Sequence, residues 1–350
     1  TVLSIAGVQP PDWMQGQAFA GTHQTAPQPF LFGERGRMDE CHDLVRSVTD
    51  GRYVYLRNYY PHVSQAQHVT YQFETPTTRV WRAIFDQGKA TEAQSIFWRV
   101  PKAPEELYDL QSDPDEVHNL AASPAHRAIL EKLRQAQRDR AAATRDVGFL
   151  PEGEIHSRSQ GSTPYDMARD ESKYPFERIV AAAELASGLE SSALPQLVKL
   201  LEDGDSAVRY WAALGILMRG QDAVSASAAA LRAALKDASP HVRIVAAQAL
   251  AQYGSQDALS PALATLSELA PPQTNGVFVA MSALSAIEAL GPKAASVREM
   301  VRKLDPQGPS PDARFNSYVP RLIANITGEP NAPAPAGKGK ARGNRNKQKQ

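Results

Sequence analysis

The sequence predicts a small α+β subdomain built on an antiparallel sheet, followed by an all-α solenoid of stacked helical pairs. Two observations carry this prediction. Aromatic residues gather in the first 147 residues, where short apolar runs alternate with turn signals, whereas the chain from residue 174 is rich in alanine and repeats itself. A chain of 350 residues is long enough for two domains that each bury a core of their own.

The overall charge is balanced, with 38 Lys and Arg against 38 Asp and Glu. This balance gives no general reason to expect a specific nucleic-acid partner or an anionic membrane surface. Cys41 is the single cysteine, so no internal disulfide can form. No apolar run approaches the roughly 20 residues of a transmembrane helix, so we expect no membrane span.

The chain opens at Thr1 without an initiator Met, a basic region or the apolar core of a signal peptide. We therefore expect it to be a fragment of a longer protein, with no targeting signal of its own to define its localisation.

The first zone, residues 1–147, predicts a sheet with a few short helices. Apolar runs cover 30–32, 44–48 and 53–56, and the last two flank Asp50-Gly51, a dipeptide suited to a hairpin turn. Further elements are expected at 77–87 (helix), 91–98 (helix), 106–110 (strand) and 124–145 (helix). Ser123 would cap the last helix, with Ile129, Leu130 and Leu133 as its buried stripe.

Two other segments lack periodicity. Residues 148–173 are rich in Gly, Ser, Pro and charge, and predict a linker or extended loop. Residues 329–350 combine Pro, Gly and Ala with Lys and Arg, and predict a disordered, solvated basic tail, with contact to an anionic polymer or surface as the alternative.

Residues 174–328 contain an internal repeat. The stretch 201–220 aligns with 235–254 at a constant offset of 34, which places Arg209 on Arg243. A third copy lies upstream with Arg178 at the same position, and a fourth, degenerate copy has Ala280 instead. Self-similarity at this period indicates helical hairpins that stack on one continuous core.

The repeated pattern D-x-x-x-x-V-R-x-x-A-A-x-x-L resembles short HEAT repeats. Tetratricopeptide units have a similar period, but their W-x-x-L-G-x-x-Y signature is absent. The resemblance implies two antiparallel helices per unit and an Asp–Arg ladder between neighbouring units. It also implies a protein partner or self-association through the repeats.

Three segments of the first zone resemble the C-terminal part of the sulfatase family, in particular its heparan-sulfatase-like branch. They are TVLSIAGVQPPDWMQGQAFAG (1–21), FGERGRMDECHDLVRSVTDGRYVYLRNYYP (32–61) and PEELYDLQSDPDEVHNLA (104–121). They occur in family order and at family spacing, so the resemblance covers about 1–147.

The third segment also has a purely structural interpretation. Leu107 and Leu110 would belong to the last strand of the sheet, and Asp113-Pro114 would form a turn. Glu116 and Asn119 would then satisfy free backbone groups of a following helical turn. This segment is therefore predicted to close the sheet and not to catalyse.

The resemblance implies a nucleophile that the sequence lacks. Sulfatases use a Cys or Ser in C/S-x-P-x-R, converted to formylglycine, beside a divalent cation of the calcium type. Cys41 is followed by His42-Asp43, and the stretches 123–127 and 310–314 miss the motif as well. We expect both cofactors in an N-terminal half outside this chain, so no catalytic or metal-binding residue is assigned here and the chain is predicted to be inactive alone.

A charged cluster precedes the hairpin and is the candidate substrate-binding site. In the family this loop faces the substrate cleft, so Arg side chains there could fork onto sulfate or uronate groups. The alternative is an Arg–carboxylate network that holds the loop. The cluster consists of Arg35, Arg37, Asp39, Glu40 and His42.

Other candidates have simpler explanations. A Cys41–His42 nucleophile is disfavoured because adjacent strand residues point to opposite faces, and a lone buried thiol is the better interpretation. His62 and His68 lack zinc spacing. Four aromatic residues on short helices predict core packing in preference to sugar stacking: Trp81, Phe85, Phe97 and Trp98.

Two functions follow. The first is a fragment of a sulfatase that acts on a sulfated glycan or another sulfate ester, with the periplasm or extracellular space as the location that the family implies. The alternative is a HEAT-repeat scaffold or protein-interaction module. The coding sequence upstream of Thr1 would discriminate between them.

Overall fold

The computed structural model describes residues 1–328 and divides into two compact units. Unit 1 comprises Thr1–Glu34, Val45–Arg57 and Glu105–Ala141, and unit 2 comprises the remaining described residues. This partition differs from the four zones expected from composition, because residues 35–44 and 58–104 group with the helical region. The predicted basic tail, 329–350, lies outside the described residues.

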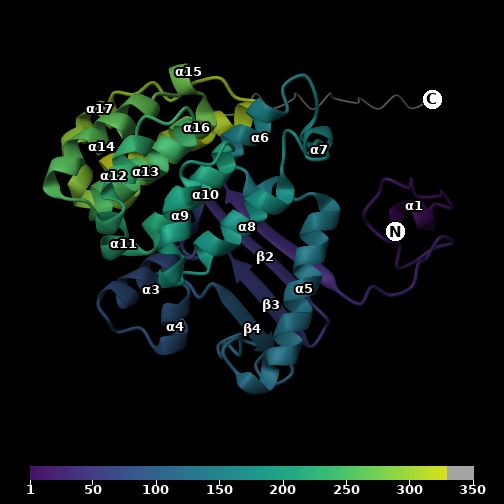
Figure 1. Ribbon diagram of the computed structural model, residues 1–350. Helices are drawn as coiled ribbons and strands as arrows, with labels where there is room; N and C mark the ends of the chain where they lie inside the picture. Colours follow the sequence, from purple (N-terminus) through teal and green to yellow (C-terminus); the bar gives the residue numbers. More distant parts are fainter. Residues whose placement is uncertain (329–350) are drawn as a thin grey trace, which may run out of the picture. The chain divides into compact units, whose positions relative to one another are not determined.

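A small antiparallel sheet has the strand order β1-β2-β3-β4 (Figure 1). Its strands are β1 (Leu31–Met38), β2 (Cys41–Thr49), β3 (Tyr53–Asn58) and β4 (Glu105–Asp109). The predicted hairpin at Asp50-Gly51 joins β2 to β3, and Gly51 has φ 96°, a conformation that glycine adopts without steric cost. In the β3–β4 ladder, Tyr55 lies opposite Leu107.

The sequence suggested that the candidate cluster lies in a loop, but the structure places it in a β-hairpin. Arg35 and Arg37 lie in β1, His42 lies in β2, and Asp39 and Glu40 form the turn between the two strands. Asp39 has φ 49°, which Asp tolerates better than most residues. The sequence did not predict β1 as a strand because charged side chains replace the apolar residues whose alternation would have indicated it.

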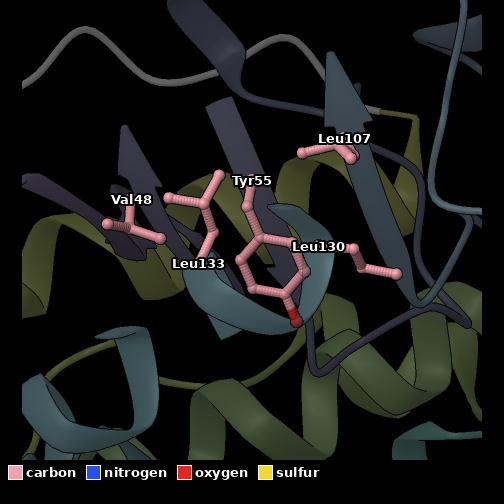
Figure 2. Close-up of a cluster of buried hydrophobic side chains, with 5 residues drawn as sticks. All are labelled: Val48, Tyr55, Leu107, Leu130 and Leu133. Atoms are coloured by element: carbon pink, nitrogen blue, oxygen red, sulfur yellow. The ribbon is translucent and has the colours of Figure 1, made fainter. Parts of the chain in front are cut away.

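The core of unit 1 lies between the sheet and α5 (Arg127–Thr144) (Figure 2). Leu130 and Leu133 of the helix pack on Tyr55 and Leu107 of the strands, and all four side chains are buried. The predicted stripe is therefore confirmed, with Ile129 at its half-buried margin. The first turn of the helix predicted at 124–145 is a separate 3-10 helix, η1 (Pro124–His126).

The segment after β4 closes the sheet through side-chain hydrogen bonds. Asn119 Oδ1 accepts from the backbone N of Leu107 at 3.0 Å, and its Nδ2 donates to the carbonyl of Glu105 at 3.0 Å. Asp113 accepts from the backbone N of His118 at 2.8 Å. The capping carboxylate is thus Asp113 and not Glu116, whose φ of 54° ends the turn without a helix.

Unit 2 contains α3 (Pro76–Asp86) and α4 (Glu92–Ile96), close to the helices predicted at 77–87 and 91–98. It also contains α2 (Thr70–Glu74), which was not predicted. The four aromatic residues predicted for the core pack on one another, but only Trp98 is buried and the other three are half-buried. Trp81 stacks on Phe97 with ring centroids 5.0 Å apart, and Trp98 is buried at their side.

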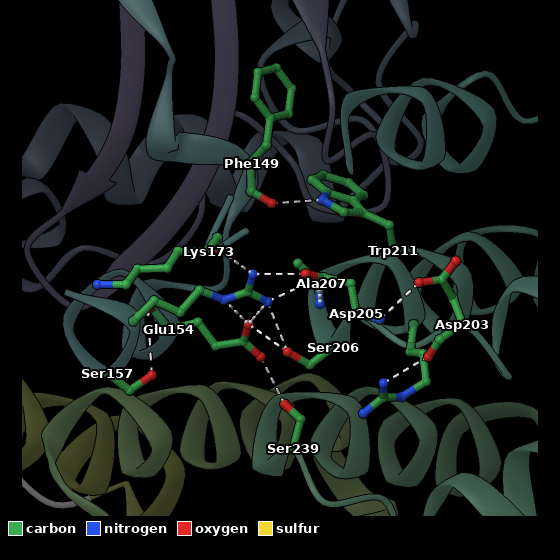
Figure 3. A network of polar contacts seen from close by, with 12 residues as sticks. Phe149, Glu154, Ser157, Lys173, Asp203, Asp205, Ser206, Ala207, Trp211 and Ser239 are labelled. Carbon is green, nitrogen blue, oxygen red and sulfur yellow. Dashed lines mark hydrogen bonds and ion pairs between the residues drawn. The ribbon is translucent and has the colours of Figure 1, made fainter. Parts of the chain in front are cut away.

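Residues 148–173, predicted as a linker, contain the end of η2 (Val147–Phe149), α6 (Glu152–Arg158) and α7 (Pro164–Met167). Phe149 is fully buried, and its carbonyl accepts from Trp211 Nε1 at 2.8 Å (Figure 3). Each helix is too short to show a helical period, so the composition alone pointed to a loop.

The region from 176 to 328 is helical, and its helices pack one on the next in chain order. The helices that carry the repeated motif contact one another in series: α8 with α10, α10 with α13, and α13 with α16. The elements are α8 (Phe176–Ser187), η3 (Ser191–Ala193), α9 (Leu194–Leu200), α10 (Ser206–Met218), α11 (Gly220–Ala226), α12 (Ala228–Ala234), α13 (Pro240–Tyr253), α14 (Gln256–Leu269), α15 (Pro272–Asn275), α16 (Val277–Leu290), η4 (Gly291–Val297), α17 (Arg298–Arg302), η5 (Ala313–Ser317) and α18 (Tyr318–Thr327).

Ion pairs connect successive copies of the repeat. Arg209 donates from Nε and Nη2 to the two carboxylate oxygens of Asp237, at 2.7 and 2.8 Å. Arg178 lies 3.6 Å from Asp203, which is the same pairing one copy earlier. In the next copy Arg243 pairs with Glu268, at 2.6 Å.

One stretch, Val277–Arg302, is long and apolar enough by length and composition to cross a membrane. Within this stretch 61% of the most apolar window is buried inside the protein, as in the core helix of a folded domain. It is weak evidence for a span.

Candidate functional site

A cavity of about 510 Å³ lies in unit 2, and we call it the hairpin cavity. Its wall comes from the β1–β2 hairpin (Arg37, Cys41, His42), the 60–68 segment (Tyr60, His62, His68) and the start of α6 (Glu152). Helices α10, α13 and α16 complete it with Tyr210, His241, Gln248, Ser282, Ser285 and Glu288.

Helix α6 is held in place by a buried polar network (Figure 3). Glu154 accepts hydrogen bonds from Ser206 Oγ at 2.8 Å and from Ser239 Oγ at 3.0 Å, at the starts of α10 and α13. Arg158 pairs with the same carboxylate, and its Nη1 lies 2.9 Å from Asp205. The network orients the first turn of α6, which carries Glu152 into the cavity wall.

Arg37 and Glu152 form the charged centre of the wall. Arg37 Nε donates to both Glu152 carboxylate oxygens, at 2.8 and 2.9 Å, and Nη2 donates to the same carboxylate. Nη1 donates to the carbonyls of Asp39 and Glu40, each at 3.1 Å. Burial would raise the pKa of Glu152, but His42 and Arg37 outweigh it, and the pKa is lowered.

The other candidate residues make contacts outside the cavity wall. Glu40 is buried, and it accepts from Thr70 Oγ1 at 2.7 Å and from Arg321 at 3.2 Å. Asp39 lies 3.1 Å from the same Arg321 nitrogen. Arg35 donates to the carbonyl of Gln65 at 2.9 Å. Of the five, the structure places only Arg37 and His42 in the hairpin cavity.

Cys41 and His42 both border the cavity, although adjacent strand residues were expected to point apart. Burial raises the pKa of the Cys41 thiol to about 12, with a smaller contribution from the charge of Glu288. Its Sγ donates to the carbonyl of His68 at 2.8 Å. A thiol held in this state is a poor nucleophile at neutral pH.

Three further ionisable groups of the cavity were not predicted as site residues, and of these the sequence analysis considered only His62, as a zinc ligand. Burial raises the pKa of Glu288 to about 7, and the charge of Glu40 adds to this while a hydrogen bond from Asn325 opposes it. Burial lowers the pKa of His62 to about 3, with a further contribution from Lys102, and it also lowers the pKa of His241.

Two of these residues, Glu288 and His241, can be recognised by comparing copies of the repeat. When Gly291 is aligned with Gly254 and Gly220, Glu288 falls where the earlier copies have Ala251 and Leu217, both buried. At the 34-residue offset, His241 likewise replaces the buried Ala207. A polar residue at a core position of a repeat is a signal for a site, and comparison between copies could have found it.

Among residues 1–328, no group of three or more His, Cys, Asp or Glu side chains is arranged to hold a metal ion. These residues therefore provide no ligand set for the divalent cation that the resemblance implies, and we derive no chemical step through one.

Fold and site together define an α+β protein whose helical part helps to build a polar, ionisable cavity. No protein-family model matches the chain. It is 36% identical over 155 residues to an ulvan-active sulfatase of Formosa agariphila, a match that covers 44% of this chain and 26% of that protein. A second ulvan-active sulfatase of the same organism is 31% identical over 139 residues, or 38% of this chain and 25% of that protein.

A region of this chain is therefore related to sulfatases. The matched region spans about a quarter of the length of these relatives.

Proposed function

We propose that this chain is the non-catalytic part of a sulfatase that acts on a sulfated glycan. The observation that carries the proposal is the 36% identity over 155 residues to a protein named for its activity on ulvan. In this proposal the β1–β2 hairpin supplies Arg37 and His42 to the glycan-binding surface, while the reacting groups belong to another part of the parent protein.

The chemistry supports this division of labour. Sulfate-ester hydrolysis needs an activated nucleophile and positive charge around the sulfuryl oxygens. The 350 residues contain no C/S-x-P-x-R motif, and the thiol of Cys41 is held protonated. The formylglycine and the calcium-type cation would accordingly lie outside this chain, which would be inactive alone. The parent protein would act in the periplasm or outside the cell.

We further propose that the helical region is HEAT-like. The 34-residue offset and the Arg209–Asp237 and Arg178–Asp203 pairs support this proposal. Solenoids often serve as interaction scaffolds. Because α10, α13 and α16 all contribute to the hairpin cavity, we favour a role in building a ligand site over a role as a scaffold.

The test is sulfate release, measured by ion chromatography with ulvan and 4-nitrophenyl sulfate as substrates. The chain alone should release none, whereas the product of the complete coding sequence should release sulfate from ulvan. Turnover by the chain alone that survives Cys41→Ser but is lost in His42→Ala would overturn the proposal. A complete product without a C/S-x-P-x-R segment and without activity would favour the scaffold.

A further inference from the structure

The hairpin cavity is lined by both polar and apolar side chains, and the two arginines in its wall are already paired. The carboxylate of Glu152 and two backbone carbonyls occupy all three nitrogens of Arg37. Arg82, the other arginine in the wall, pairs with Asp86 at 2.9 Å. An anion that entered the cavity would therefore have to compete for guanidinium groups that already hold carboxylates.

Three of the four histidines of the wall favour a neutral ligand. Burial lowers the pKa of His62, His68 and His241, so these rings are neutral near pH 7. A neutral imidazole offers one N–H donor and one acceptor, which is also the pattern of a hydroxyl group. His62 Nδ1 is buried without a hydrogen-bond partner among the described residues. A buried polar atom in this state costs about 1–3 kcal/mol unless a ligand or water satisfies it.

Glu288 adds a carboxyl group to the wall of the cavity. It lies in α16, where earlier copies of the repeat carry Leu217 and Ala251, and Asn325 donates to its Oε1. Glu288 is half-buried, and a carboxyl group that folding removes from water lowers stability unless hydrogen bonds compensate, as the bond from Asn325 does in part. Carboxyl groups of this kind hold the hydroxyls of a ligand as acceptors when ionised and as donors when protonated.

The aromatic side chains and the volume of the cavity also suit a sugar ligand. The Tyr60 and Tyr210 hydroxyls hydrogen-bond each other at 2.7 Å, and the ring of His42 stands against Tyr60 with centroids 5.3 Å apart. The volume of about 510 Å³ lies within the roughly 300–1,000 Å³ of small-molecule sites. Rings beside fixed donors and acceptors suit the apolar faces and hydroxyls of a sugar.

We propose that the hairpin cavity binds one neutral, hydroxyl-rich sugar unit, with His62 and Glu288 as its principal hydrogen-bonding residues. The inference rests on the proposed function for the origin of the sugar, which would be an unsulfated unit of the glycan. It implies that the helical repeats contribute to the specificity for the glycan.

Saturation-transfer NMR on the complete 350-residue chain tests this inference without any need for turnover. The probes are methyl β-glucopyranoside, glucuronate, glucose 6-sulfate and sodium sulfate, each at about 10 mM because weak sugar binding has a Kd near the millimolar range. The neutral glycoside should give transfer signals, and sodium sulfate should not compete with it.

Three variants locate the binding. Glu288→Gln keeps the shape of the side chain and should weaken binding about tenfold, the equivalent of one lost hydrogen bond to a charged group. Ser285→Trp fills the cavity and should abolish binding. Glu299→Gln, on exposed α17, is the matched control and should bind like the wild type. Far-ultraviolet circular dichroism establishes that each variant is folded.

The inference is overturned if only the sulfated or carboxylated probes bind, or if a folded Ser285→Trp variant binds the neutral glycoside normally. Its failure is distinct from failure of the proposed function, because sulfate release by the complete gene product does not depend on these binding results.

Discussion

Arg37 Nε lies 2.8 and 2.9 Å from the two carboxylate oxygens of Glu152, a residue 115 positions further along the chain. Both side chains are largely buried, at 11% and 17% exposure. The pair ties the β1–β2 hairpin to α6 and forms the charged centre of the hairpin cavity.

Arg37→Met should lower the free energy of unfolding by about 3 kcal/mol, because removal of one partner leaves a buried charge without compensation. The double variant Arg37→Met/Glu152→Met should recover at least half of that loss. Urea unfolding measures both values. Additive losses in the double variant would mean that the two charges do not interact.

Glu288 should make the stability of the protein depend on pH. Its pKa is about 7 in the folded state and near 4.5 when unfolded, so the folded state holds its proton more tightly. Its contribution to stability is therefore present below about pH 4.5 and is lost as the pH rises through about 7. Glu288→Gln should be more stable than the wild type by roughly 1–3 kcal/mol at about pH 8, and nearly equal at about pH 4.5.

The measurement must compare the stability of the variant with that of the wild type at each pH, because His62 makes stability depend on pH in the opposite direction. Its lowered pKa makes the protein lose stability as the pH falls below 6.5. The groups that act on Glu288 are Asn325, whose hydrogen bond lowers the pKa, and Glu40, which raises it and is paired with Arg321. An unchanged difference between pH 4.5 and 8 would show that Glu288 titrates normally.

A side chain at Gly153 should displace the ring of His241. A Cβ at this position would lie 2.4 Å from His241 Nε2, well inside contact distance. Gly153→Ala should therefore cost about 1–3 kcal/mol and shift the imidazole resonances of His241. Gly204→Ala is the control, because its Cβ would meet nothing within 4 Å. Equal stability of the two variants would mean that α6 does not press on His241.

The Arg209–Asp237 pair should matter more than an exposed pair of the same kind. Its side chains are 15% and 11% exposed, and Asp237 also accepts from the backbone N of Ser239 at 2.7 Å. Asp237→Ala should destabilise the helical region by about 2 kcal/mol, since both a charge pair and a backbone hydrogen bond are lost. Asp257→Ala breaks the exposed pair with Arg232 and should cost under about 0.5 kcal/mol. Thermal unfolding that ranks the two variants in reverse order would contradict this role.

Local sequence was informative where periodicity and turn chemistry are strong. The Asp50-Gly51 hairpin, the buried stripe of Leu130 and Leu133, and the alanine-rich repeat helices were all predicted. The signal failed where charges replace apolar side chains in a strand, as at Arg35 and Arg37, and where helices have only one or two turns, as in α6 and α7. A period cannot be detected within so few residues.

For the site, the sequence predicted Arg37 and His42 as candidates but left their environment open. That Arg37 is neutralised by Glu152 and that Glu288 titrates near neutrality follow from burial and from partners more than 100 residues away, which no local pattern encodes. The sequence by itself determined the two kinds of architecture, because hydrophobic periodicity acts over neighbouring residues. Only the tertiary structure decided which charges are matched, because desolvation and pairing depend on what the folded chain brings together.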